Sequence, residues 1–142
     1  MFDPRVARRS EMGGEGLLST ARDYARFLQM LVNGGELGGR RLLKAETVAE
    51  MTRDQLGNID RGPAYAPGPG YTFGLGFAVR TAGRDAQPAG EPGDYWWGGA
   101  GGTYFWVDPK NQMFAILMMQ SPSLRQVWRP RLRQMVYDAT QR

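Results

Sequence analysis

The chain has 142 residues, and 42% of them are hydrophobic, which is enough to bury the core of one domain or of a large part of one. It contains neither cysteine nor histidine, so it cannot form disulfide bonds, cysteine-ligated zinc sites or a Ser-His-Asp triad on its own. Its formal net charge of +4 comes from basic residues spread along the sequence, so we expect no nucleic-acid partner.

The sequence also predicts no membrane partner. Its longest apolar run, residues 113–119, is far shorter than the roughly 20 residues that a membrane-spanning helix requires. Residues 1–10 are charged and show no export signal, and the compartment stays undecided.

The first third of the chain predicts an irregular arm followed by two helices. Residues 1–16 are polar and glycine-rich, which is typical of an irregular arm. Apolar side chains then recur every three or four residues, which predicts a helix over residues 20–33 with Ser19 as its N-cap and Tyr24 in the core. A second helix is expected over residues 45–55.

The middle of the chain predicts loops on either side of a strand. Residues 57–70 and 81–94 are rich in glycine and proline and predict long loops, and residues 71–80 predict a strand. Glu91 and Asp94 flank the next strand and could form a carboxylate pair, although a solvated loop is the simpler interpretation.

A hairpin and a helix are expected next. Residues 95–99 predict an extended segment, and residues 103–120 predict two strands joined by a turn that Asp108 begins. The unbroken apolar run in 113–120 predicts a strand buried on both faces.

A helix is expected over residues 129–140, with an apolar face formed by Leu132, Met135, Val136 and Ala139. The nearby basic group is interpreted as a solvated helix face; its members are Arg125, Arg129, Arg131 and Arg133. Trp106 and Trp128 are expected to pack between helix and sheet.

Residues 96–103 hold four glycines in two pairs, which is unusual for a strand because glycine packs no side chain. One interpretation is that the bare backbone lets N–H groups approach a substrate carbonyl oxygen. The other is a glycine-kinked strand corner beneath two packed tryptophans, and the motif alone leaves both open.

Taken in order, four stretches resemble the serine β-lactamase and penicillin-binding-protein superfamily, and most of all class C β-lactamases and family VIII carboxylesterases. They are residues 16–27, 35–51, 71–77 and 97–109. The resemblance implies an α+β fold in which this chain is the C-terminal part of an antiparallel sheet flanked by helices, an incomplete fold on its own. It also implies that residues 1–142 are the C-terminal segment of a single β-lactamase-like serine hydrolase domain.

The resemblance also implies site residues. Trp97-Gly98-Gly99 resembles the superfamily's third motif, in which most β-lactamases have Lys-Thr-Gly and the esterase-like branch often has Trp-Gly-Gly. By this resemblance Trp97, Gly98 and Gly99 bind substrate, and the backbone N–H of Ala100 contributes to the oxyanion hole. The missing lysine favours a small neutral ester or amide over a β-lactam. No cofactor and no metal ion are implied.

The superfamily's nucleophile motif, Ser-x-x-Lys, and its Tyr-x-Asn motif are both absent from this sequence. We therefore expect this segment alone to be inactive and to belong to a longer hydrolase that works through an acyl-serine. Its expected partner is a missing N-terminal half, or a second copy that pairs with strand 113–120. The alternative is a non-catalytic binding or structural protein that keeps part of the fold.

Overall fold

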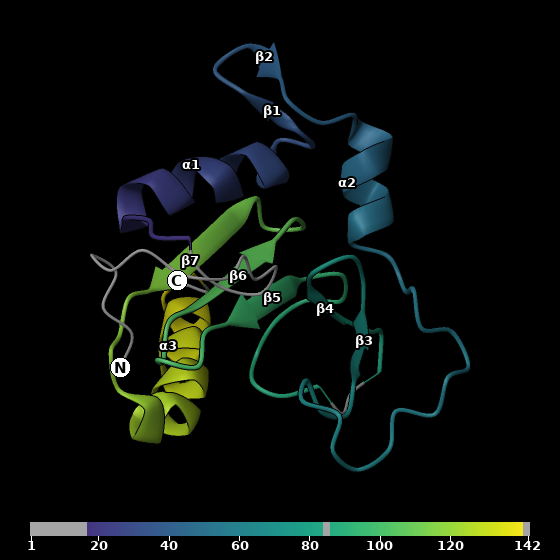
Figure 1. The fold of residues 1–142 in the computed structure, drawn as a ribbon, viewed down its shortest axis with the longest axis vertical. Coiled ribbons are helices and arrows are strands. Elements are labelled where there is room, and N and C mark those ends of the chain that lie inside the picture. The colour runs from purple at the N-terminus through teal and green to yellow at the C-terminus, as the bar shows by residue number, and fades with distance from the viewer. Residues whose placement is uncertain (1–16, 84–85, 141–142) are drawn as a thin grey trace, which may run out of the picture.

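The computed structural model describes residues 17–83 and 86–140, and these form a five-stranded antiparallel sheet between two helices (Figure 1). Each strand lies beside its neighbours in sequence, in the order β3-β4-β5-β6-β7. The strands are β3 (Tyr71–Phe73), β4 (Ala78–Arg80), β5 (Tyr95–Gly98), β6 (Tyr104–Asp108) and β7 (Met113–Leu117). The predicted α+β class is confirmed, whereas the arm predicted for residues 1–16 lies outside the described residues.

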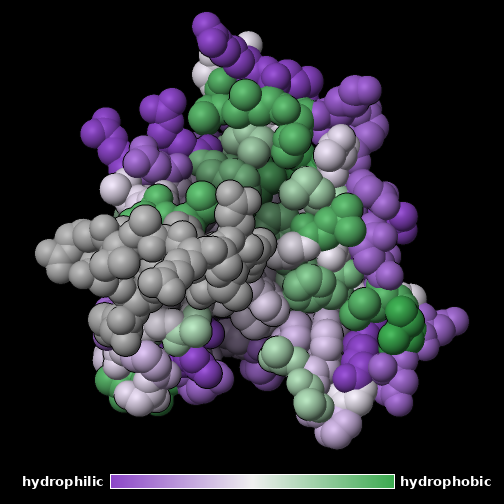
Figure 2. Space-filling view, viewed as in Figure 1, coloured by the Kyte–Doolittle hydropathy of each residue, from purple (hydrophilic) through white to green (hydrophobic). Residues whose placement is uncertain are grey.

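Three α-helices and a small hairpin complete the described part. They are α1 (Ala21–Val32), β1 (Glu36–Leu37), β2 (Arg40–Arg41), α2 (Ala45–Met51) and α3 (Arg125–Thr140), with the 3₁₀ turn Pro122–Leu124 before α3. Hydrophobic residues gather between α1, β1 and α2, while the tip of the β1–β2 hairpin is hydrophilic (Figure 2). No helix in the described ranges is both long and apolar enough to cross a membrane.

The sheet separates two hydrophobic clusters because side chains alternate along each strand. On β6, Phe105 and Val107 pack with α1, whereas Tyr104 and Trp106 pack with α3. Trp106 is fully buried, so its predicted packing role is confirmed. The core therefore lies on both faces of β6, and this strand fixes the position of its neighbour β5.

Helix boundaries differ from the prediction where local hydrogen bonds decide them. Helix α1 is capped by Thr20 rather than Ser19, because Asp23 stands three residues after Thr20 and its N–H donates to the Thr20 hydroxyl at 3.1 Å. Helix α2 ends at Met51, four residues earlier than predicted. Helix α3 begins at Arg125 and contains Pro130 in its second turn.

The strand predicted over residues 71–80 is instead a hairpin, β3 and β4, joined by residues 74–77. The chain turns there because the N–H of Leu75 donates to the Met51 carbonyl at 2.9 Å, which docks the hairpin on α2. Gly76 has a positive φ of 93°, which favours glycine. A side chain on Gly74 would lie 2.1 Å from the Met51 oxygen, so this contact also requires glycine.

Strand β7 is shorter than predicted and is not buried on both faces. All five of its residues are partly exposed, because β7 is an edge strand with only β6 beside it among the described residues. Its side chains still alternate between the two clusters: Phe114 and Ile116 face α1, and Met113, Ala115 and Leu117 face α3. The apolar run therefore predicted the strand, but the prediction that both of its faces are buried is wrong.

The inward face of α3 also differs from the prediction. Leu132 and Val136 pack against the sheet, but Met135 is 57% exposed, and the buried residues are Arg133 and Tyr137. Trp128, predicted to pack between helix and sheet, is 41% exposed and lies beneath the Arg131 guanidinium. A buried arginine on this helix requires a polar partner inside the fold.

Burial raises the pKa of all six tyrosines and brings the pKa of Tyr71 to about 12. Since the unfolded value is about 10, the folded chain holds more protons than the unfolded chain between these pH values. We therefore expect stability to fall as the pH rises from about 10 to 12. Ultraviolet absorbance of tyrosinate should appear at higher pH in buffer than in urea; coincident titrations would contradict this expectation.

Candidate functional site

A cleft of about 600 Å³ lies where β5 ends and α3 begins. Its walls come from the loop before β3, the loop before β5, the end of β5 with the following turn, and the first turns of α3. The lining residues are Ala66, Pro67, Gln87, Pro88, Trp96, Trp97, Gly98, Gly99, Ala100, Tyr104, Arg125, Gln126, Arg129 and Pro130. The four residues that the sequence singled out, 97–100, thus lie together in one cleft wall.

Residues 99–102 form a tight turn between β5 and β6. The N–H of Gly102 donates to the Gly99 carbonyl at 3.1 Å, and the N–H of Gly99 donates to the Thr103 carbonyl at 2.9 Å. Gly102 has a φ of 120°, a conformation that favours glycine. Ala100 is exposed at the second position of this turn, and no group in the described part of the chain accepts a hydrogen bond from its N–H.

Two arginines of α3 hold the carbonyl groups of this turn. Nη2 of Arg129 donates to the Gly99 carbonyl at 2.6 Å and to the Thr103 carbonyl at 2.9 Å. Nη1 of Arg125 donates to the Ala100 carbonyl at 2.9 Å. The solvated face predicted for the arginines is therefore wrong for Arg129, which is half-buried, and for Arg133, which is fully buried.

Sequence reasoning missed this role, although a signal was present. Arg125, Arg129 and Arg133 are four residues apart, so they share one side of a helix. The glycine-rich turn exposes backbone carbonyl oxygens that such side chains can reach. Only the packing of α3 against the sheet shows that the two segments meet.

Aromatic rings line part of the cleft. Trp97 is 37% exposed and meets Phe73 edge to face, with 5.1 Å between ring centroids. Trp96 stacks on Trp97 at 5.8 Å, and its buried Nε1–H has no hydrogen-bond partner among the described residues. This part of the cleft suits an apolar group.

The charges at the cleft are positive, since its lining residues include Arg125 and Arg129 but no acid. Burial lowers the pKa of the Arg129 guanidinium, and the nearby Arg125 charge lowers it further. Arginine stays protonated in proteins nevertheless, because its intrinsic pKa is above 12. The site can therefore stabilise negative charge on an oxygen, but its lining includes no serine, threonine, cysteine or lysine to act as the nucleophile.

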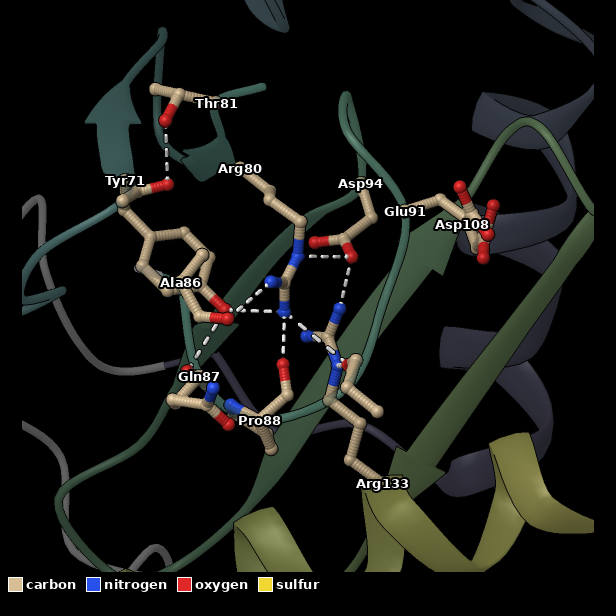
Figure 3. A network of polar contacts seen from close by, with 12 residues as sticks. Tyr71, Arg80, Thr81, Ala86, Gln87, Pro88, Glu91, Asp94, Asp108 and Arg133 are labelled. Atoms are coloured by element: carbon tan, nitrogen blue, oxygen red, sulfur yellow. Dashed lines mark hydrogen bonds and ion pairs between the residues drawn. The ribbon is translucent and has the colours of Figure 1, made fainter. Parts of the chain in front are cut away.

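A buried ionic network connects β4, the loop before β5 and α3 (Figure 3). Asp94, which is fully buried, accepts hydrogen bonds on Oδ2 from Nε of Arg80 at 2.9 Å and from Nη2 of Arg133. The remaining guanidinium donors bind Tyr71, Tyr104 and the carbonyls of Ala86, Pro88 and Ala89. This network joins the loop before β5 to α3, which are two walls of the cleft.

Glu91 and Asp94 do not form a carboxylate pair, and the solvated loop predicted for them holds only for Glu91. Glu91 pairs with Lys110 at 2.7 Å near the surface, whereas Asp94 points into the core. Burial raises the pKa of the Asp94 carboxyl, and the two guanidinium groups oppose that rise.

Asp108 begins the predicted turn, and its carboxylate accepts a hydrogen bond from the Asn111 N–H at 3.0 Å. The same carboxylate also accepts a hydrogen bond from the Tyr137 hydroxyl at 2.6 Å.

Comparison with known proteins relates the chain to one family. The family model described as Beta-lactamase matches residues 1–137. A protein of Mycobacterium tuberculosis, described as uncharacterized, is 34% identical over 113 residues, which cover 75% of this chain and 28% of that protein. The chain therefore spans about a quarter of the length of this curated relative.

Two solved structures share the fold and are each 25% identical to the chain. EstCE1, a hydrolase with promiscuous acyltransferase activity, has a TM-score of 0.67, with 82% of this chain and 29% of EstCE1 covered. A Bacteroides dorei protein, proposed to be a β-lactamase, has a TM-score of 0.72, with 97% of this chain and 46% of that protein covered. From its matched sequence and its fold, the chain belongs to the β-lactamase family.

Proposed function

We propose that this chain is the part of a β-lactamase-like serine hydrolase that binds the substrate carbonyl, while sequence outside the chain supplies the nucleophilic serine and its base. The observation that carries the proposal is Ala100, an exposed residue in the wall of the 600 Å³ cleft next to Trp97-Gly98-Gly99, whose N–H has no hydrogen-bond acceptor among the described residues. The absence of Ser-x-x-Lys from the sequence is the reason for placing the nucleophile elsewhere.

The proposed chemistry is acyl transfer to water. The serine oxygen attacks the carbonyl carbon, its proton passes to the base, and the carbonyl electron pair moves onto oxygen. The N–H of Ala100 donates to that oxygen while it carries negative charge. The intermediate then expels an alcohol or amine, which takes the proton held by the base. Water next attacks the carbonyl of the acyl-serine and gives a proton to the base, and the serine oxygen leaves and takes that proton back, which releases the carboxylic acid.

A small neutral ester or amide is the proposed substrate class. Trp97 stands where most β-lactamases have a lysine that offers a cation to a substrate carboxylate, and its ring extends the apolar side of the cleft. EstCE1, whose fold the chain shares, is a hydrolase with promiscuous acyltransferase activity, which supports acyl transfer as the reaction class.

Strand β7 is the proposed place where the rest of the hydrolase joins this chain. Its five residues are partly exposed and apolar, and one edge of the strand has no neighbour among the described residues. An unpaired edge offers a row of backbone donors and acceptors to another strand. A second copy of the chain that pairs at this edge is the alternative occupant, and light scattering with a sizing column separates the two.

Reconstitution tests the proposed function. The chain is expressed together with a β-lactamase-family segment that contains Ser-x-x-Lys, and the complex is assayed with p-nitrophenyl esters and a chromogenic cephalosporin. We expect ester hydrolysis that requires both parts and that disappears when the serine is changed to alanine. If a folded complex hydrolyses neither substrate, the chain is a non-catalytic binding or structural protein instead.

A further inference from the structure

Arg129 holds the peptide that carries the Ala100 N–H, and it does so from the opposite side. Its Nη2 donates to the Gly99 carbonyl at 2.6 Å, and that carbonyl belongs to the same peptide unit as the Ala100 N–H. In a trans peptide the C=O and the N–H point in opposite directions. A fixed Gly99 oxygen therefore also fixes the direction in which the Ala100 N–H points.

The guanidinium occupies space that only a glycine at position 98 leaves open. A Cβ built on Gly98 would lie 2.7 Å from both Cζ and Nη2 of Arg129. The guanidinium also lies against the ring of Tyr104, the residue paired with Gly98 on β6, with Cζ 5.6 Å from the ring centroid. The same Nη2 also donates to Thr103, so one cation ties together the two ends of the turn.

This contact also makes the amide a stronger donor. A cation that donates to a peptide oxygen polarises the peptide, because hydrogen bonds along a chain reinforce one another. The hydrogen of the Ala100 N–H then carries more positive charge. Arg125 holds the next carbonyl, that of Ala100, at 2.9 Å, so consecutive peptides of the turn are fixed from the α3 side.

We infer that Arg129 is a positioning residue for the Ala100 amide and acts through the Gly99–Ala100 peptide without contacting the reacting atoms. Gly98 allows this contact because it has no side chain to occupy the place of the Arg129 guanidinium. The inference rests on the proposed function, since it assigns Arg129 to the oxyanion donor of that site.

Steady-state kinetics of the reconstituted enzyme on a p-nitrophenyl ester test this role. Removing an oxyanion donor lowers kcat by about 10²–10³, so misaligning one should lower it less. For Arg129→Gln we expect kcat to fall about 10-fold with KM within about twofold, because the contact matters in the transition state. Arg129→Lys, which keeps one charged donor, should recover part of the loss. Arg131→Gln, an exposed site on the same helix, is the control and should match the unsubstituted chain.

A double-mutant cycle separates positioning from a general structural role. Gly98→Ala should displace the guanidinium and reproduce the Arg129→Gln loss in kcat, because the clash is with the mobile end of a side chain. The pair together should be no worse than Arg129→Gln alone, since both changes remove one contact. Losses that multiply to about 100-fold would overturn the inference, as would a loss confined to KM.

A spectroscopic measurement keeps this test independent of activity. In the isotope-labelled complex, Arg129→Gln should shift the carbonyl-carbon resonance of Gly99 and the amide resonance of Ala100, and Arg131→Gln should shift neither. An inactive complex that shows these shifts contradicts the proposed function but leaves Arg129 as the residue that fixes the peptide. Unchanged resonances in Arg129→Gln contradict the positioning role itself.

Discussion

Replacing Ala100 with proline is expected to lower kcat of the reconstituted hydrolase by about 10²–10³, because it removes one oxyanion donor. Proline lacks the backbone N–H, so the substitution deletes the proposed catalytic group and little else. Ala100 is the second residue of the 99–102 turn, and proline is favoured at that position of such turns. The turn should therefore persist.

Two measurements decide this prediction. The ester-hydrolysis assay gives kcat and KM, and we expect the loss in kcat, because the N–H is needed most when the oxygen carries negative charge. Circular dichroism and thermal unfolding should match those of the unsubstituted chain. A folded Ala100→Pro variant with unchanged kcat would place the oxyanion donor elsewhere.

Replacing Asp94 with alanine is expected to destabilise the chain by about 3–5 kcal/mol, because it leaves two buried guanidinium groups without their counter-charge. Asp94 and Arg133 are both fully buried, and Arg80 is nearly so. Arginine stays protonated in proteins, so losing a proton cannot relieve the unpaired charge. A loss of this size approaches the whole stability of a small domain.

Urea unfolding of Asp94→Ala measures this effect, and Glu91→Gln is its matched control. Glu91 lies three residues away and also pairs with a basic side chain, Lys110, but that pair is exposed to solvent. Exposed pairs contribute little, so the control should unfold at nearly the same urea concentration as the unsubstituted chain. Equal midpoints for Asp94→Ala and Glu91→Gln would show that the buried network does not stabilise the fold.

Much of the fold could be predicted from the sequence, because local periodicity decides local structure. The helical spacing of Tyr24 and its neighbours predicted α1, and alternation and turn residues predicted the β6–β7 hairpin around Asp108. The motif at 97–100 predicted which residues lie in the cleft wall, although their catalytic role stays a prediction. The hairpin within 71–80 was missed, because the contact between Leu75 and Met51 that bends the chain joins two separate elements.

What the sequence by itself determined is the family resemblance, the α+β class and the absence of a nucleophile motif, since each depends on residue order alone. Only the tertiary structure decided the roles of Asp94, Arg129 and Arg133, which looked like solvated charges. A charge is stable in the interior when a partner distant in sequence is brought within hydrogen-bonding distance. That distance is set by how α3 packs on the sheet, which no local pattern of residues encodes.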